Sequence, residues 1–370
     1  MTATISNATS KASSKSTSNA MNVRLIAAAL LSALAVAPAA AEDLPTHHFK
    51  GIASFSSSPV YSTRAKPFWE QVAKDSNGKI TADVLTIDQL GLKGGEVFRT
   101  IKSGLFNYVT NVMSFAAGDD PRNEALDIAG IAQTVPEVES MDRAYRPVLE
   151  KLYETKYNLK LMGVWPIGPV VIWCNAPVTS LADLKGKKVR AFNRTMSDFV
   201  QGAGAVPVSM SFGEMVTGLQ RGTVDCAITS PRSGLKAGLA EVTTHVLPVS
   251  LGWAAVIDAF NVGAWKALDK PTQDFLKAHY DALRQKVYKE VDDETEDAYR
   301  CLQGKKPCDS PGPMKQPLVV TPLSAKDKAE VAEIVKTKIL PGWAKRCGAE
   351  CTDEWNKTVG KSLGITLAVK

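Results

Sequence analysis

Residues 183–230 constrain the fold most, because short apolar runs alternate there with stretches of helical spacing. The first run ends at Arg190 and the others lie at 206–210 and 224–229, and strands separated by helices in this way favour a parallel sheet with right-handed crossovers. Arg190 stands at the end of the first run, where an open α/β sheet presents its ligand crevice. A guanidinium there can bind a carboxylate through two parallel hydrogen bonds. The sequence therefore predicts a receptor for a small organic anion.

The remaining pattern predicts an α/β fold of two lobes. Strands are expected at 48–54, 79–87 and 106–113, with helices at 61–75 and ending at Gly104, which gives a βαβαβ order. A proline-glycine interruption at 166–169 marks the expected crossing to the second lobe, and residues 245–261 return. Pro271 begins a long amphipathic helix, and two helices, over 325–340 and 352–363, close the chain.

The N-terminus has the pattern of a secretory signal peptide. Arg24 precedes an apolar run over 25–36, and small residues follow at 39–41. We expect cleavage near Ala41, and Met21 is an alternative start of translation. Without residues 1–41 the formal charge falls from +6 to +3, because Lys11, Lys15 and Arg24 are removed with no acidic residue.

The six cysteines all follow this segment. Cys301 with Cys308, and Cys347 with Cys351, are spaced for short-loop disulfides in an oxidising compartment. A four-cysteine metal site is disfavoured because no C-x-x-C pair occurs. Cys174 and Cys226 lie in expected strands and are interpreted as small buried hydrophobic residues.

Several function classes are disfavoured by what the sequence lacks. No cluster of Lys and Arg interleaves with aromatic residues, so nucleic acid is a poor candidate for the partner. The G-x-S-x-G, H-E-x-x-H and phosphate-loop motifs are missing. We therefore expect no catalysis, no cofactor and no metal site.

The order of motifs resembles the substrate-binding proteins of tripartite ATP-independent periplasmic (TRAP) transporters, dicarboxylate-binding group. The resemblance covers nearly all of the mature chain. It depends on SNGKITADVL, QLG and EVFRTIKSGLFNYV in the first half, and on LADLKGKKVRA, GAVPVSMSFGEMVTGLQRGTVDCAI and AEVTTHVL in the second. Each motif is weak alone, and the ordered set is specific.

The resemblance implies a two-lobed periplasmic binding protein fold of the type II-like class, with a mixed sheet in each lobe and a long helix spanning both. Lobe I is expected over 42–166 and about 252–290, and lobe II over 167–251. Residues 291–370 are expected to pack on both lobes.

The resemblance also implies a set of ligand contacts. Arg190 matches the carboxylate-clamping arginine, and Asn193, Phe212, Ser54 and Asn111 match positions at the crevice. Thr229 replaces an asparagine found in many members, and a second arginine of some members would fall near Val170 but is absent, which disfavours highly polar sugar acids. Trp165 and Trp253 are predicted to supply an apolar wall, and Arg194 a second charge.

The resemblance implies a function in transport. A periplasmic receptor, mostly monomeric, would deliver an organic acid to small and large TRAP membrane subunits for uptake driven by an ion gradient. Two alternatives remain open from the sequence: a receptor of an ATP-driven importer, and an exported α/β enzyme.

Overall fold

The computed structural model describes residues 44–369. The predicted signal peptide and the alternative start at Met21 lie outside these residues. Within the described chain, no helix combines the length and the apolar character needed to cross a membrane.

The first sheet has five strands in the order β2-β1-β3-β10-β4. Strand β1 (His47–Ala53) pairs in parallel with β2 (Ile80–Thr86) and β3 (Tyr108–Val112). Strand β10 (Ala255–Asn261) runs antiparallel to β3 and to β4 (Leu159–Pro166). The helices of this half include α1 (Lys66–Asp75), α2 (Glu96–Lys102) and α3 (Val135–Tyr157). The βαβαβ order predicted for the start of the chain is confirmed.

The second sheet has six strands in the order β11-β9-β5-β8-β6-β7. Strand β6 (Lys188–Ala191) pairs in parallel with β7 (Val206–Ser209) and β8 (Cys226–Thr229). Strand β5 (Val171–Cys174) is antiparallel to β8 and β9 (His245–Leu247), and β11 (Val319–Val320) adds an edge. Helices α4 (Arg194–Gly202), α5 (Met215–Gln220) and α6 (Pro231–Ala237) connect or follow these strands. The parallel arrangement expected around Arg190 is therefore present.

Two of the segments that connect the sheets, between β4 and β5 and between β9 and β10, are hydrogen-bonded to each other. The Ile167 N–H donates to the Trp253 carbonyl at 2.9 Å, and the Val170 N–H donates to that of Gly252 at 2.8 Å. The Leu251 N–H donates back to the Val170 carbonyl at 3.0 Å. Because backbone groups of the two segments pair with each other, the two crossings lie side by side.

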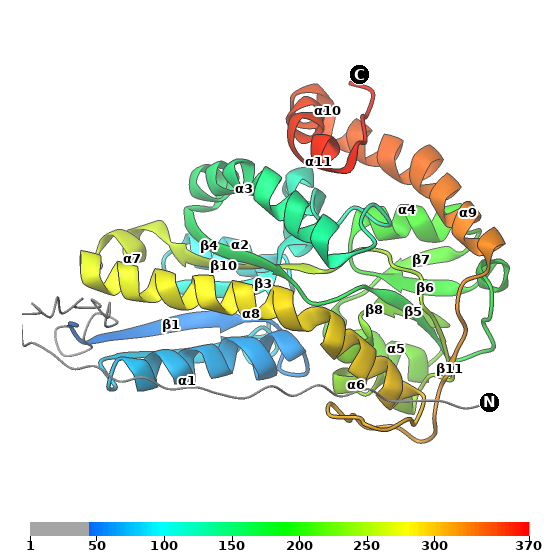
Figure 1. The fold of residues 1–370 in the computed structure, drawn as a ribbon, viewed down its shortest axis with the longest axis horizontal. Coiled ribbons are helices and arrows are strands. Elements are labelled where there is room, and N and C mark those ends of the chain that lie inside the picture. Colours follow the sequence, from blue (N-terminus) through cyan, green and yellow to red (C-terminus); the bar gives the residue numbers. More distant parts are fainter. Residues whose placement is uncertain (1–43, 370) are drawn as a thin grey trace, which may run out of the picture. The chain divides into compact units, whose positions relative to one another are not determined.

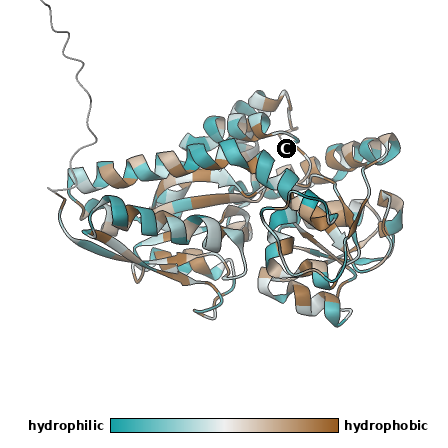
Figure 2. Cartoon of the chain, turned by 60° about the horizontal axis from the view of Figure 1, so that its bottom comes forward, coloured by the Kyte–Doolittle hydropathy of each residue, from teal (hydrophilic) through white to brown (hydrophobic). Residues whose placement is uncertain are grey.

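Helix α8 (Lys270–Leu302) runs past both sheets (Figure 1). It begins at a capping residue, Asp269, whose carboxylate accepts the Thr272 N–H at 2.9 Å. The apolar stripe of this helix packs inward at Leu276, Tyr280, Val287 and Val291. Figure 2 shows the strands mainly hydrophobic and the outward faces of the helices mainly hydrophilic, as expected for packed layers.

The C-terminal helices differ from the expectation. Helix α9 (Ala325–Ile334) continues through Val335–Ile339 into α10 (Leu340–Trp355), followed by Asn356–Gly360 and α11 (Lys361–Leu363). Residues 341–351, expected to lie between two helices, are thus largely helical. Pro341 directly follows the π-helical turn Val335–Ile339 without ending the helical stretch, and the break comes instead at Gly348, where φ is 78°.

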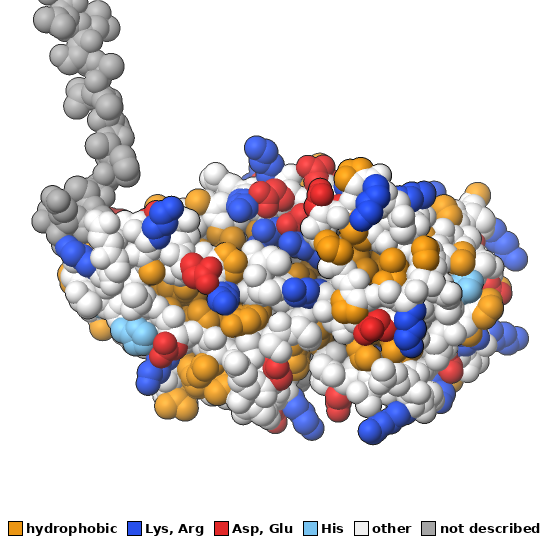
Figure 3. All heavy atoms as spheres, turned by 90° about the horizontal axis from the view of Figure 1, so that it is seen from below, with side chains coloured by type: hydrophobic (Ala, Val, Ile, Leu, Met, Phe, Trp, Pro, Cys, Tyr) orange, Lys and Arg blue, Asp and Glu red, His pale blue; other side chains and the backbone are white. Residues whose placement is uncertain are grey.

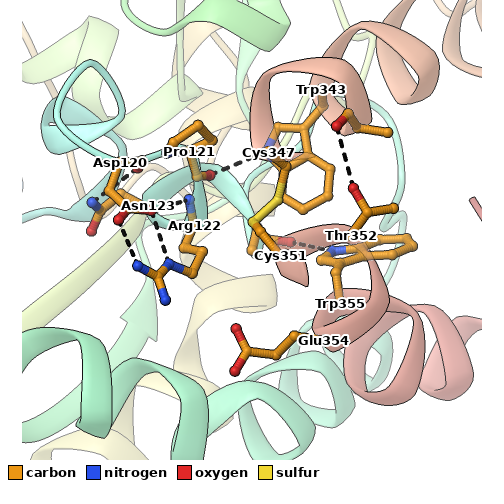
Figure 4. Close-up of a disulfide and its surroundings, with 12 residues drawn as sticks. Asp120, Pro121, Arg122, Asn123, Trp343, Cys347, Cys351, Thr352, Glu354 and Trp355 are labelled. Carbon is orange, nitrogen blue, oxygen red and sulfur yellow. Dashed lines mark hydrogen bonds and ion pairs between the residues drawn. A yellow bond between two sulfur atoms is a disulfide. The ribbon is translucent and has the colours of Figure 1, made fainter. Parts of the chain in front are cut away.

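A disulfide between Cys347 and Cys351 spans this break (Figure 4). On either side of it, the Trp343 indole N–H donates to the Pro121 carbonyl at 3.1 Å and that of Trp355 to the Ala125 carbonyl at 3.3 Å. These contacts attach the C-terminal helices to the segment 121–125 of the first half.

Two further disulfides are present, and one corrects the sequence interpretation. Cys301–Cys308 was expected, but Cys174 and Cys226 are also joined rather than being separate buried thiols. Strands β5 and β8 place these two residues directly opposite each other, with their Cα atoms 4.1 Å apart. That register depends on the pairing of strands distant in sequence, so residue spacing did not reveal it.

The surface carries both signs of charge. On the face in Figure 3, Lys and Arg side chains are interspersed with Asp and Glu, and hydrophobic side chains lie between them. That face therefore lacks the single-sign positive field that attracts a nucleic-acid backbone.

Candidate functional site

Arg190 is held at the carboxyl edge of the second sheet by backbone acceptors. Its Nε–H donates to the Met210 carbonyl at 2.9 Å, just beyond β7, and Nη1 donates to the Ile228 carbonyl in β8 at 2.8 Å. The side chain is 1% exposed. The two parallel neighbours of β6 thus fix the orientation of the guanidinium.

This buried cation forms no ion pair within the described chain. Two of its five N–H groups are used by backbone carbonyls, and no carboxylate of residues 44–369 forms an ion pair with it. Burial lowers the pKa of Arg190 to about 9, and the negative charge of Glu214 opposes the shift; the group stays protonated at neutral pH. An uncompensated buried charge is unfavourable, so the site is suited to an anion.

A small cavity of about 30 Å³ lies at the guanidinium. Its walls come from both halves of the fold and from the crossing between them. The lining residues are Ser54, Ser58, Val112, Phe115 and Ala254 from the first half, Ile167 and Val170 from the crossing, and Arg190, Phe192, Phe212, Thr229, Ser230 and Ser233 from the second.

Aromatic rings form much of this wall. The Phe192 ring centroid lies 5.1 Å from Cζ of Arg190, within the range of a cation–π contact. Phe115 packs edge-on against Phe192, with centroids 6.1 Å apart, and Phe55 packs behind Phe212 at 5.7 Å. The positive end of the cavity is therefore bordered by apolar surface.

A buried carboxylate supports the backbone beside the cavity. Oδ1 of Asp127 accepts the N–H groups of Trp253 and Ala254, both at 2.9 Å, and Oδ2 accepts the Ser114 hydroxyl at 3.3 Å. These bonds hold Ala254 in the left-handed region, with φ 50°. Burial raises the pKa of Asp127 to about 7 despite the hydrogen bonds it accepts.

Four of the residues singled out from the sequence meet at the cavity: Arg190, Phe212, Thr229 and Ser54. They come from separate segments of the chain. Oγ of Ser54 and Oγ1 of Thr229 make no hydrogen bond within the described chain, so both hydroxyls are available to a bound molecule.

The other five do not line it. Oδ1 of Asn193 accepts the Met196 N–H at 2.9 Å and caps α4, and Nδ2 of Asn111 donates to the Gly94 carbonyl at 3.3 Å. The indole N–H of Trp165 donates to Asp258 at 2.6 Å, and that of Trp253 to the Ala132 carbonyl at 3.2 Å. Arg194 is exposed and pairs with Asp198 at 3.3 Å.

Sequence reasoning passed over the aromatic members Phe115 and Phe192. Phe192 had a usable signal, because it lies two residues after Arg190 and extended chain places such residues on one side. Phe115 follows β3 in a short helical turn, Met113–Ala116, and the pattern gave no sign that this turn reaches the second half.

Comparisons of the sequence and of the structure both match bacterial solute-binding proteins. The family model for bacterial extracellular solute-binding proteins, family 7, matches residues 52–338. The ectoine-binding periplasmic protein TeaA of Halomonas elongata is 25% identical over 214 residues, which are 56% of this chain and 62% of TeaA. A solute-binding protein of Albidiferax ferrireducens is 28% identical over 182 residues, 47% of this chain and 52% of the relative. The chain thus spans about half to three fifths of these curated relatives.

Solved structures show the same fold at lower sequence identity. DctP7 of Bordetella pertussis, an extracytoplasmic solute receptor binding pyroglutamic acid, has a TM-score of 0.73 and 21% identity, covering 84% of this chain and 99% of DctP7. A TRAP periplasmic solute-binding protein from Desulfovibrio salexigens with bound orotic acid has a TM-score of 0.74 and 20% identity, covering 86% and 99%.

Proposed function

Since the chain belongs to family 7 of the bacterial extracellular solute-binding proteins, the TRAP-type solute receptors, we propose that it binds a small organic acid at Arg190. The family consists of receptors rather than enzymes, so the alternatives of an exported enzyme and of an ATP-driven importer are set aside. The observation that carries the proposal is the buried guanidinium with unused N–H groups and no ion-pair partner in the described chain. Two proteins of the same fold bind the cyclic carboxylic acids pyroglutamic acid and orotic acid.

The ligand carboxylate supplies the missing negative charge. It accepts hydrogen bonds from the free N–H groups of Arg190, and Ser54 and Thr229 offer further hydroxyl donors. Phe212 covers the ligand body. Asn193, Asn111, Trp165 and Trp253 act indirectly, by holding the elements that carry the cavity, and Arg194 contributes only to the surrounding positive potential.

Binding closes the two halves on the ligand. We assign residues 42–166 and about 252–290 to lobe I and 167–251 to lobe II, with 291–370 packing on both. A cavity of about 30 Å³ holds little more than two water molecules, so the lobes separate to admit an acid. The ligand then favours the closed form because it contacts both lobes, and exclusion of water strengthens its pairing with Arg190.

The receptor works outside the cytoplasm. After cleavage near Ala41 the protein resides in the periplasm, mostly as a monomer, and presents its ligand to the small and large membrane subunits for uptake driven by an ion gradient. The three disulfides support this location, because disulfides persist in oxidising compartments.

Calorimetry with an arginine variant tests the carboxylate site. A thermal-shift screen of organic acids first identifies a ligand, since a molecule that binds only the folded state raises its melting temperature. Arg190→Gln should then weaken binding by about 10²- to 10⁴-fold, the effect of breaking a buried pair worth about 3–5 kcal/mol. The exposed Arg221→Gln is the matched control and should bind as the wild type does. Unchanged affinity in the Arg190 variant would refute the proposal.

A further inference from the structure

The cavity carries a single formal charge. Of the residues that line it within the described chain, Arg190 alone is ionisable at neutral pH, and none is Lys, His, Asp, Glu, Asn or Gln. A second carboxylate buried here would find no cation, and an ammonium group would find no anion, which is unfavourable for either. The site therefore suits a molecule with one negative charge and no positive one.

The polar capacity beyond the arginine is small. Five hydroxyl side chains reach the cavity. One O–H of the Ser230–Ser233 pair is engaged in the 2.8 Å bond between them, and Oγ of Ser58 accepts the Val60 N–H at 3.2 Å, which leaves its own O–H free to donate. The hydroxyls of Ser54 and Thr229 are those left without a partner in the described chain, one from each side of the cavity. A sugar acid with four or more hydroxyl groups would leave several of them unpaired on burial, which costs binding free energy.

The rest of the wall is apolar and partly flat. Phe115, Phe192 and Phe212 come from three segments of the chain, and the Phe192 ring lies next to the guanidinium. Aromatic faces pack well against flat rings. A ligand whose carboxylate reaches Arg190 must therefore place the adjoining atoms against phenyl groups.

From these three observations we infer that the ligand is a compact cyclic or aromatic monocarboxylate with at most one or two polar substituents. The inference rests on the proposed function and names the substrate class of the same site. Dicarboxylates, amino acids and polyhydroxylated sugar acids are disfavoured by the single charge and the few hydroxyl groups of the lining.

Calorimetry with matched probes tests the class on the full mature protein. The probes are benzoate, its neutral analogue benzamide, the dicarboxylate succinate and the sugar acid gluconate. Benzoate should bind at least tenfold more tightly than each of the other three. Succinate or gluconate binding as tightly as benzoate would overturn the class while leaving the carboxylate receptor intact. Failure of every organic acid in the wider screen would overturn the proposed function itself.

A variant pair separates the aromatic wall from general stability. Phe212→Leu should reduce benzoate affinity by about three- to tenfold, because it removes one ring from the wall. Phe275→Leu, a similarly half-buried phenylalanine on α8 outside the cavity, should bind benzoate as the wild type does. Equal effects of the two substitutions would overturn the aromatic contribution. Melting temperatures measured without ligand verify that both variants fold.

Discussion

Replacing Glu294 by glutamine removes a charge on which two arginines from opposite sides of the cavity converge. Oε2 of Glu294, on α8, lies 2.7 Å from Nη2 of Arg64 and 2.5 Å from Nη1 of Arg232. Arg64 follows β1 of the first sheet, and Arg232 lies in α6 next to the cavity residues Ser230 and Ser233. If the halves separate to admit a ligand, these pairs cannot all persist.

The burial of the three groups sets the size of the effect. Side-chain exposure is 7% for Arg64, 17% for Arg232 and 20% for Glu294. Exposed pairs are worth about 0–1 kcal/mol, and removal of one partner from a fully buried pair costs about 3–5 kcal/mol. Glutamine keeps an acceptor for one arginine, so we take about 2 kcal/mol for this partly buried cluster.

That energy should appear as lost ligand affinity. A contact made only in the closed form stabilises that form, and its loss lowers the fraction of the protein that is closed around the ligand. A loss of about 2 kcal/mol raises the Kd by about 30-fold. Calorimetry on Glu294→Gln measures it. Glu290→Gln is the matched control, since Glu290 is 38% exposed and contacts Arg64 at 3.4 Å and Lys286, on its own helix, at 4.0 Å. The loss of ligand affinity in this variant should stay below about fivefold. Equal affinities of the two variants would refute a role for the cluster in closure.

Three further predictions concern stability, each measured by urea unfolding without ligand. Because burial raises the pKa of Asp127 to about 7, the native state binds its proton more tightly than the unfolded state, and stability should fall as pH rises from about 4 to 7 with a slope of up to about 1.4 kcal/mol per unit. Asp127→Asn should flatten the slope between about pH 6 and 7, and an unaltered slope would contradict the assignment. Trp165→Phe should cost about 1–3 kcal/mol by removing a donor from the buried Asp258, whereas wild-type stability would show that this hydrogen bond is dispensable. Alanine pairs at the disulfides should rank by loop length, with Cys174–Cys226, 52 residues apart, costing more than Cys301–Cys308, 7 apart; the reverse order would contradict a chain-entropy origin.

Local pattern was sufficient for much of the fold. The βαβαβ start, the long helix after Pro271 and the parallel strands around Arg190 each follow from periodicity and turn residues within one segment. The same reasoning failed at residues 341–351, which fell outside the two helices predicted for the C-terminus and which are largely helical. The disulfide and the two tryptophans, which are long-range contacts, flank the break at Gly348.

The cavity residues that the sequence pointed to each lie at or shortly after the end of a strand; they are Ser54, Arg190, Phe212 and Thr229. Arg190 lies at the cavity because β6 ends there, and that end was visible in the sequence. The position of Trp165 and Trp253 near strand ends predicts an apolar wall, but their indole N–H groups donate to Asp258 and to the Ala132 carbonyl. Phe115 and Phe192 line the cavity instead. Which aromatic side chain reaches a cleft between two sheets depends on long-range packing, and no local pattern encodes it.

A crystal structure of the protein with the acid that raises its melting temperature most would test the central claim directly. We predict both carboxylate oxygens at about 2.7–2.9 Å from donors of Arg190 or a neighbouring hydroxyl, with the ligand between the two sheets. An acid bound elsewhere, with the Arg190 N–H groups facing only water, would contradict the account.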